Sequence, residues 1–229
     1  MQLYSSETLQ TSSLRADMVI SCLPSNALSR ILSNSPRSSS LLSEIPFVDV
    51  GVVNLGYSSP VLPVKGFGYL VPRTQDSSVL GCIFDSVTLP NVHNMNQDRM
   101  TVMMGGSSFS ELFGDANKVD PNLLLRVAQK SLARHLGIRA NPTASHVTVA
   151  KSCIPQYLVG HHARLERLHD ALKAETQGAL VAGCSFGGVG INDVLLNARS
   201  VANAAVESIL GNSIGVGPTG LESIVGGTK

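Results

Sequence analysis

The chain has 229 residues, a formal net charge of +1 and 43% hydrophobic residues. This length and apolar content suffice for one or two domains with a buried core. The balanced charge lacks the basic excess that phosphate binding requires, so we expect no nucleic-acid partner. No apolar run reaches the roughly 18 residues that a membrane-spanning helix needs, although peripheral membrane contact stays open.

The four cysteines stand far apart in the sequence, without a Cys-x-x-Cys pair, at Cys22, Cys82, Cys153 and Cys184. This spacing predicts neither a metal site nor a disulfide framework, and we expect small, reduced core residues. At the N-terminus no basic segment leads into an apolar one, so the sequence predicts no signal peptide.

The first half of the chain is predicted to be rich in strands. A short buried strand over residues 17–22 precedes a helix that Ser25 caps and that runs through Leu32. The serine-rich segment 33–43 is expected to be a loop or a frayed helix. Alternation and β-branched residues then predict strands over residues 47–57, 64–72, 79–89 and 100–104. Because short polar loops separate these strands, we expect an antiparallel sheet.

The second half is predicted to alternate helices and strands. In chain order these are a helix, a strand, a helix, a strand and a helix, over residues 121–135, 146–151, 160–173, 179–182 and 192–210. Asp120 and Pro121 are typical of the start of the first of these helices, and Gly137 of its end. The glycine-rich segment beyond residue 211 is expected to be loose.

The most informative segment is AGCSFGGVGINDVLLNA, from Ala182 to Ala198. Its glycines, at 183, 187, 188 and 190, allow a flat ligand to approach the backbone. Asn192 and Asp193 open a helix whose N-terminus carries about half a positive charge and favours electron-rich oxygens. On local physics alone, a glycine turn that only packs a helix against a sheet is the simpler interpretation.

Several segments, taken together, resemble one known family. AGCSFGGVGINDVLLNAR resembles the C-terminal flavin-binding segment of the flavin amine oxidase superfamily, in the form found in protoporphyrinogen oxidases. Other blocks resemble consecutive segments of the same family at matching spacing: ADMVISCLPSNALSRIL, VGVVNLGY, LPVKGFGYLVP, VLGCIFDSV, MTVMMGG and CIPQYLVGHHARLERL. The resemblance covers about residues 15–210 and corresponds to the C-terminal half of the family.

This resemblance implies a mixed α+β and α/β fold in two domains. Residues 1–24 and 143–211 would form a partial, Rossmann-like FAD-binding domain without the family's N-terminal Gly-x-Gly-x-x-Gly unit. Residues 25–142 would form a substrate-binding domain on a mixed or antiparallel sheet, and residues 212–229 a flexible tail.

The family catalyses the six-electron oxidation of protoporphyrinogen IX to protoporphyrin IX in haem biosynthesis, with non-covalent FAD and with oxygen as acceptor. The resemblance places Cys184, Val189, Gly190 and Ile191 at the FAD, and it assigns no catalytic acid or base. It also places six apolar or small residues at the substrate: Phe67, Gly68, Leu70, Ile83, Met103 and Ile154. A homodimer at the mitochondrial inner membrane is implied by the family, without a targeting signal in this chain.

Two other interpretations stay open. Because the family's nucleotide fingerprint is missing from the sequence, we expect the chain to be inactive alone, and it could be a non-catalytic binding or interaction fragment. Another flavin amine oxidase, such as a polyamine oxidase or carotene desaturase, is the further alternative.

Three local patterns are set aside. Residues 215–220 match Gly-x-Gly-x-x-Gly but follow a predicted helix rather than a strand. Residues 183–187 match the Gly-x-Ser-x-Gly nucleophile elbow, but no histidine follows Ser185 in the chain. His161 and His162 are adjacent, so their side chains cannot share one helix face, and we expect both to be solvated.

Overall fold

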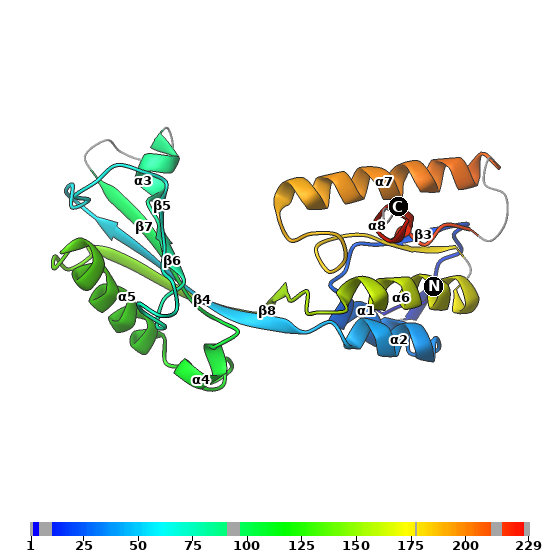
Figure 1. Ribbon diagram of the computed structural model, residues 1–229, viewed down its shortest axis with the longest axis horizontal. Helices are drawn as coiled ribbons and strands as arrows, with labels where there is room; N and C mark the ends of the chain where they lie inside the picture. Colours follow the sequence, from blue (N-terminus) through cyan, green and yellow to red (C-terminus); the bar gives the residue numbers. More distant parts are fainter. Residues whose placement is uncertain (1, 5–10, 91–96, 177, 212–216, 227–229) are drawn as a thin grey trace. The chain divides into compact units, whose positions relative to one another are not determined.

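The computed structural model describes residues 2–4, 11–90, 97–176, 178–211 and 217–226. The chain forms two compact units, drawn in Figure 1: unit 1 contains residues 1–46 and 155–229, and unit 2 contains residues 47–154. These limits differ from the expected boundaries after residues 24 and 142. The reason is that the helix of residues 36–43 packs against the helix of residues 161–175 in unit 1, whereas the last strand of unit 2 runs on to Pro155.

Unit 2 is built on a five-stranded sheet in the order β5-β6-β7-β4-β8. The strands are β4 (Phe47–Tyr57), β5 (Gly68–Leu70), β6 (Gly81–Ile83), β7 (Asp98–Gly106) and β8 (Ala144–Pro155). The pairs β4–β7, β5–β6 and β6–β7 are antiparallel, which confirms the expected sheet. The predicted third strand is shorter than expected, because the chain after β6 turns into the short helix α3 (Asp85–Thr88).

One face of this sheet is buried under α5 (Pro121–Leu136). Asp120 caps the helix by accepting the Asn122 N–H, and the left-handed Gly137 ends it, as the sequence predicts. Leu124, Ala128 and Leu132 recur every four residues and are fully buried. They pack with residues of the sheet that alternate along β4 and β7, among them Val53, Leu55, Met100, Val102 and Met104. The short helix α4 (Phe109–Phe113) follows β7.

Unit 1 contains two parallel strands, β3 (Val19–Ser21) and β9 (Ala179–Val181), and five helices among its described residues. The helices are α1 (Ser25–Ile31), α2 (Pro36–Ser43), α6 (His161–Glu175), α7 (Ile191–Ile209) and α8 (Glu222–Val225). A short antiparallel pair, β1 (Gln2–Tyr4) and β2 (Thr11–Ser13), completes the strands described in the unit. Helices, an antiparallel sheet and a parallel pair together confirm the mixed fold class.

Two local expectations for unit 1 need correction. Ser25 is the first residue of α1 rather than its cap, which is Pro24. The serine-rich segment forms a regular helix, α2, because Pro36 suits a first helical position and Leu41 and Leu42 are buried where α2 packs on α6.

Three of the four cysteines also depart from the expected buried positions. Cys22 and Cys153 are exposed, Cys184 is half-buried, and Cys82 is buried in the core of unit 2. All four are free thiols, as expected.

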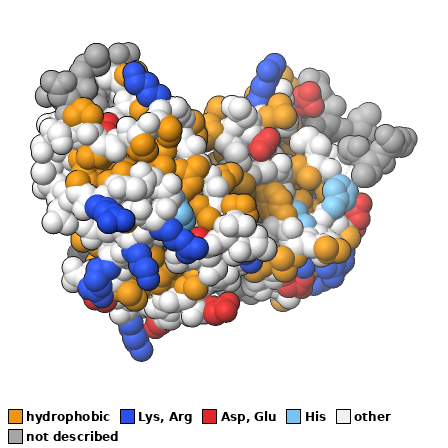
Figure 2. All heavy atoms as spheres, turned by 60° about the vertical axis from the view of Figure 1, so that its left-hand side comes forward, with side chains coloured by type: hydrophobic (Ala, Val, Ile, Leu, Met, Phe, Trp, Pro, Cys, Tyr) orange, Lys and Arg blue, Asp and Glu red, His pale blue; other side chains and the backbone are white. Residues whose placement is uncertain are grey.

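Helix α7 has two apolar sides. Val201 and Ala205 pack against Leu180 and Ala182 around β9. The other side leaves large apolar residues exposed, namely Ile191, Leu195, Leu196, Val206, Ile209 and Leu210. Hydrophobic side chains also reach the surface between Lys and Arg side chains on the face drawn in Figure 2. Within the described part of the chain, no helix combines the length and apolarity needed to cross a bilayer.

The C-terminal segment 217–226 covers the free edge of β9. The Val181 N–H donates to the Thr219 carbonyl at 2.8 Å, whereas the next N–H along the strand, that of Ala182, donates to Ser21 of β3 at 2.9 Å. Because successive N–H groups of a strand point to opposite edges, the segment lies on the edge that β3 leaves open. Leu221 and Thr219 are buried, so the expectation of a loose tail is wrong for these residues. Residues 212–216 and 227–229 of that tail lie outside the described residues.

This packing makes Gly220 hard to replace. Its φ is +85°, and a Cβ at this position would lie 2.3 Å from the Val181 carbonyl oxygen. We expect Gly220→Ala to lower the free energy of unfolding by about 2 kcal/mol or more, through the strained backbone and the clash. Gly217→Ala is the control, since its Cβ would meet no atom closer than 4.0 Å. Urea unfolding of both variants is the measurement, and equal destabilisation would contradict the packing.

Candidate functional site

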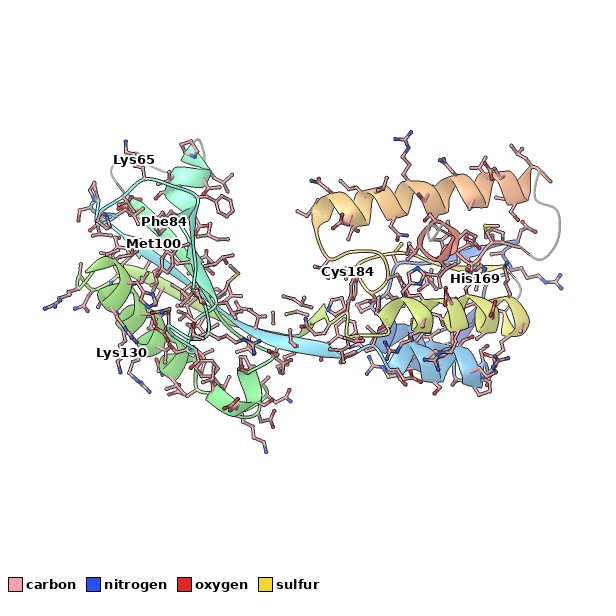
Figure 3. All side chains as sticks on the ribbon, in the orientation of Figure 1. Lys65, Phe84, Met100, Lys130, His169 and Cys184 are labelled. Atoms are coloured by element: carbon pink, nitrogen blue, oxygen red, sulfur yellow. The ribbon has the colours of Figure 1, made fainter. Side chains whose placement is uncertain are left out.

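The glycine-rich turn between β9 and α7 gathers four of the expected site residues. Figure 3 labels Cys184 on this turn, where it is half-buried. Val189 and Ile191 are exposed, at 52% and 79% of their surface, and Gly190 between them is the N-cap of α7. The four residues therefore lie along one short stretch of backbone that ends at a helix N-terminus.

Hydrogen bonds to α7 and to the start of α1 hold the first residues of the turn. The Gly183 N–H donates to Oδ1 of Asn197, in α7, at 3.0 Å. The hydroxyl of Ser185 accepts the N–H of Ser25, at the start of α1, at 3.0 Å. Ser185 is 1% exposed, so its hydroxyl is a structural acceptor rather than the exposed nucleophile of an elbow.

Tyr157 and His161 hold the rest of the turn. The Tyr157 hydroxyl donates to the Cys184 carbonyl at 2.5 Å and accepts the Gly188 N–H at 2.9 Å. Nε2 of His161 lies 3.1 Å from the Phe186 carbonyl. The two rings stack with centroids 4.1 Å apart and planes 8° from parallel. The expectation of a solvated histidine is wrong for His161, which is buried because the first turn of α6 packs against the glycine turn.

The protonation states of this pair follow from burial. Desolvation raises the pKa of Tyr157, and Cys184 and Asp193 raise it further. The hydrogen bond from the Gly188 N–H lowers this pKa but does not outweigh them, so the phenol keeps its proton. Desolvation lowers the pKa of His161, and Arg164 and His162 lower it further against the effect of the Phe186 carbonyl. A carbonyl can only accept, so neutral His161 carries its proton on Nε2.

At two glycines of the turn, side chains of neighbouring helices occupy the space that a Cβ would need. Gly188 has φ +152°, and a Cβ there would lie 2.3 Å from Cβ of Asp193. A Cβ on Gly187 would lie 3.0 Å from Cδ1 of Ile224, in α8. At these two positions the structure therefore uses glycine for close packing on α7 and α8.

The turn also offers groups that a flat, partly polar ring could use. Helix α7 has no side-chain cap, so its first N–H groups are free to meet an acceptor. Oγ of Ser25 and Nδ2 of Asn197 are buried without a hydrogen-bond partner among the described residues. With Val189 and Ile191 as exposed apolar contacts, the set suits a ligand that has an apolar ring face and a carbonyl-bearing edge.

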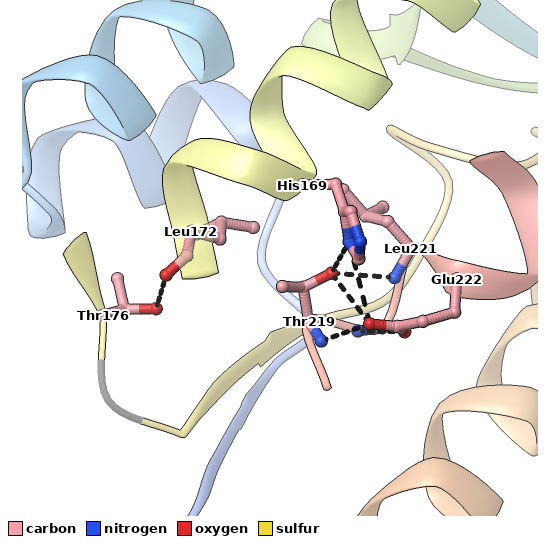
Figure 4. A network of polar contacts seen from close by, with 7 residues as sticks. His169, Leu172, Thr176, Thr219, Leu221 and Glu222 are labelled. Carbon is pink, nitrogen blue, oxygen red and sulfur yellow. Dashed lines mark hydrogen bonds and ion pairs between the residues drawn. The ribbon is translucent and has the colours of Figure 1, made fainter. Parts of the chain in front are cut away.

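A second polar network, drawn in Figure 4, joins α6 to the C-terminal segment 217–226. Nδ1 of His169, in α6, lies 2.6 Å from the Thr219 hydroxyl. Glu222 accepts the N–H groups of Thr219 and Gly220 at 2.7 and 3.0 Å. His162 reaches the Ile224 carbonyl at 3.1 Å. Thr219 and Glu222 have the Thr-x-x-Glu spacing of a capping box, a sequence signal that could have revealed this ordered segment.

In unit 2, four of the six expected substrate residues lie on one face of the sheet. The register pairs Gly68 with Ile83 and Gly81 with Met103. Since side chains alternate with a period of two, Gly68, Leu70, Ile83 and Met103 share the face away from α5. Leu70 is 83% exposed. Phe67, directly before β5, and Ile154, near the end of β8, are also exposed.

A cleft of about 610 Å³ in unit 2 does not coincide with these residues. Its walls contain the polar residues Asn54, Asp85, Thr101 and His146 beside apolar ones, and none of the six. Thr101 donates to Asp85 at 2.7 Å and accepts from Asn54 at 2.8 Å. Because these polar groups satisfy one another, the apolar face is the better candidate for a flat hydrophobic ligand.

The comparisons with known proteins agree with this geometry. Residues 4–206 match the family model described as flavin containing amine oxidoreductase. The chain belongs to this family. Human protoporphyrinogen oxidase is 39% identical over 197 residues, which cover 85% of this chain and 41% of the human protein. Coproporphyrinogen III oxidase of Bacillus subtilis (strain 168) is 28% identical over 207 residues, 89% of this chain and 43% of that protein.

A solved structure from Exiguobacterium sp. 255-15 shares the fold, with a TM-score of 0.73 at 20% identity over 93% of this chain and 44% of that one. The chain thus spans less than half the length of each of these relatives.

The network around His169 predicts a pH dependence. Burial lowers the pKa of His169, and the nearby charge of Lys173 lowers it further. The carboxylates of Glu222 and Asp170 raise this pKa but do not outweigh burial. Burial opposes ionisation of Glu222, but the N–H groups of Thr219 and Gly220 and the nearby His169 outweigh it and lower its pKa. Both groups bind protons less readily when folded, so their contribution to stability is present above the unfolded pKa values and is lost as pH falls.

We therefore expect the melting temperature to fall between about pH 7.5 and about pH 5.5, as the unfolded histidine, with a pKa of about 6.5, takes up its proton. His169→Gln should flatten this fall, and His146→Gln, at an exposed site of unit 2, should not. Thermal melts over this pH range are the measurement. A slope unchanged in His169→Gln would show that the network does not titrate with folding.

Proposed function

We propose that this chain acts in the oxidation of protoporphyrinogen IX to protoporphyrin IX, with FAD bound non-covalently and oxygen as acceptor. The reaction removes six electrons and six protons from the substrate, and three oxygen molecules take them up as three molecules of hydrogen peroxide. The observation that carries the proposal is the 39% identity to human protoporphyrinogen oxidase over 85% of this chain.

The proposal gives each unit a role. In unit 1, Cys184, Val189, Gly190 and Ile191 would contact the flavin ring. In unit 2, apolar or small residues would line the substrate cavity, namely Phe67, Gly68, Leu70, Ile83, Met103 and Ile154. Bound FAD supplies the electron acceptor, while these residues hold and orient the two flat rings and exclude water. No side chain is assigned as a catalytic acid or base.

Location and assembly follow from the family in the same proposal. We place the protein at the mitochondrial inner membrane, with peripheral membrane contact, as a homodimer. The support is the similarity to the human relative.

A second candidate is a binding role without catalysis. It is favoured by the exposed apolar side of α7. An apolar surface of this kind is typical of a protein interface.

One experiment separates the two roles. The purified chain is incubated with FAD, freed of excess and examined by visible absorbance, then supplied with protoporphyrinogen IX or with coproporphyrinogen III. Retained flavin with a protein-perturbed spectrum, together with porphyrin fluorescence that grows with oxygen uptake from protoporphyrinogen IX, would support the oxidase role and overturn the expectation that the chain is inactive alone. Retained flavin without oxidation of either substrate would favour the binding role, and absence of retained flavin would contradict the FAD site.

Ile191 allows a matched test of the turn. Ile191→Ala removes exposed apolar surface at the start of α7, and Ile209→Ala makes the same change at the other end of the helix. Loss of an aliphatic contact that bound flavin would cover should raise the FAD dissociation constant about three- to tenfold in Ile191→Ala alone. Quenching of flavin fluorescence measures both constants. Equal affinity in the two variants would exclude Ile191 from the site.

A further inference from the structure

Tyr157 is the side chain that joins the two ends of the glycine turn. Its single hydroxyl bonds the Cys184 carbonyl on one side and the Gly188 N–H on the other. These groups are four residues apart and belong to the stretch of backbone between β9 and α7. The hydroxyl therefore fixes the width of the turn directly before Val189 and Ile191.

His161 supports this arrangement from behind. It bonds the Phe186 carbonyl, which lies between the two groups that Tyr157 holds, and its ring stacks on the Tyr157 ring. Its other nitrogen, Nδ1, is buried and has no partner in the described part of the chain. The imidazole is thus held in one orientation by a carbonyl on one side and an aromatic ring on its face.

We infer that Tyr157 and His161 form a clamp that positions the flavin-contacting turn. This inference rests on the proposed function. Neither side chain needs to touch the cofactor: both act through the backbone of residues 184–188 and so set where the uncapped start of α7 meets the flavin. They are positioning residues.

The test uses variants that remove one part of the clamp at a time. Tyr157→Phe keeps the stacked ring and removes the hydroxyl. His161→Gln keeps an N–H donor for the Phe186 carbonyl, whereas His161→Phe keeps a ring without the donor. Tyr69→Phe is the matched control, because the Tyr69 hydroxyl also contacts a histidine, Nδ1 of His135 at 3.2 Å, but in unit 2.

All variants are made in the full 229-residue chain. We expect the FAD dissociation constant to rise about tenfold in Tyr157→Phe and His161→Phe, since each leaves backbone groups of the turn without a partner. His161→Gln should restore most of the affinity, and Tyr69→Phe should bind as the parent does. The visible circular dichroism of bound flavin should change in the two weakened variants, because the ring then sits in an altered turn.

Hydrogen exchange of the chain without FAD gives the second readout. The Gly188 amide should be protected in the parent and in Tyr69→Phe, and should exchange faster in Tyr157→Phe while amides of α6 and β4 stay protected. If Tyr157→Phe stays folded and binds FAD with the parent's affinity and dichroism, the inference fails and the proposed function stands. If the parent retains no FAD, both fail.

Discussion

The backbone of the turn at residues 183–188 is the constraint on which the rest of unit 1 depends. A turn that leaves β9 and enters α7 has carbonyl and N–H groups that no regular ladder can satisfy, and a buried unpaired group is costly. Asn197, Tyr157 and His161 satisfy four of these groups from three sides. Because these partners come from α7, the loop before α6 and α6 itself, the turn ties both helices to one piece of backbone.

In unit 2 the central feature is a sheet of which α5 covers one face. Its sheet needs only one covered face, because α5 buries the side chains of β4 and β7 that point toward it. The opposite face carries Leu70, which is 83% exposed, together with Ile83 and Met103. The same face also holds the hydrogen-bonded pair Asn54 and Thr101, where α3 contacts β7. Because backbone hydrogen bonds hold the sheet, the apolar part of this face is a rigid surface, and it suits a flat ligand better than the cleft with its hydrogen-bonded polar groups does.

The sequence predicted what depends on local signals. The cap and stop of α5 follow from Asp120 and Gly137, and the alternation of β4 follows from Val53 and Leu55. It also predicted the strand, glycine turn and helix at residues 179–209. It missed the clamp, since Tyr157 and His161 bond backbone atoms 27 and 25 residues away, and such bonds leave no pattern in the sequence. The segment of α2 was expected to be a loop or a frayed helix because serines weaken helical propensity, whereas burial of Leu41 and Leu42 where α2 packs on α6 makes the helix regular.

The two units differ in what they can discriminate. Under the proposed function, the turn would meet the flavin through backbone groups, a cysteine and two aliphatic side chains, none of which distinguishes one ring substituent from another. Such a surface binds a planar cofactor but adds little selectivity between substrates, because hydrophobic contacts separate similar ligands by only about 1 to 3 kcal/mol. Under the proposed function, the choice between two porphyrinogens must therefore come from polar groups that meet the substrate's carboxylates. None of the six apolar or small residues proposed for the cavity can supply such a group, so these residues would fix the plane of the tetrapyrrole and leave its substituents to other side chains.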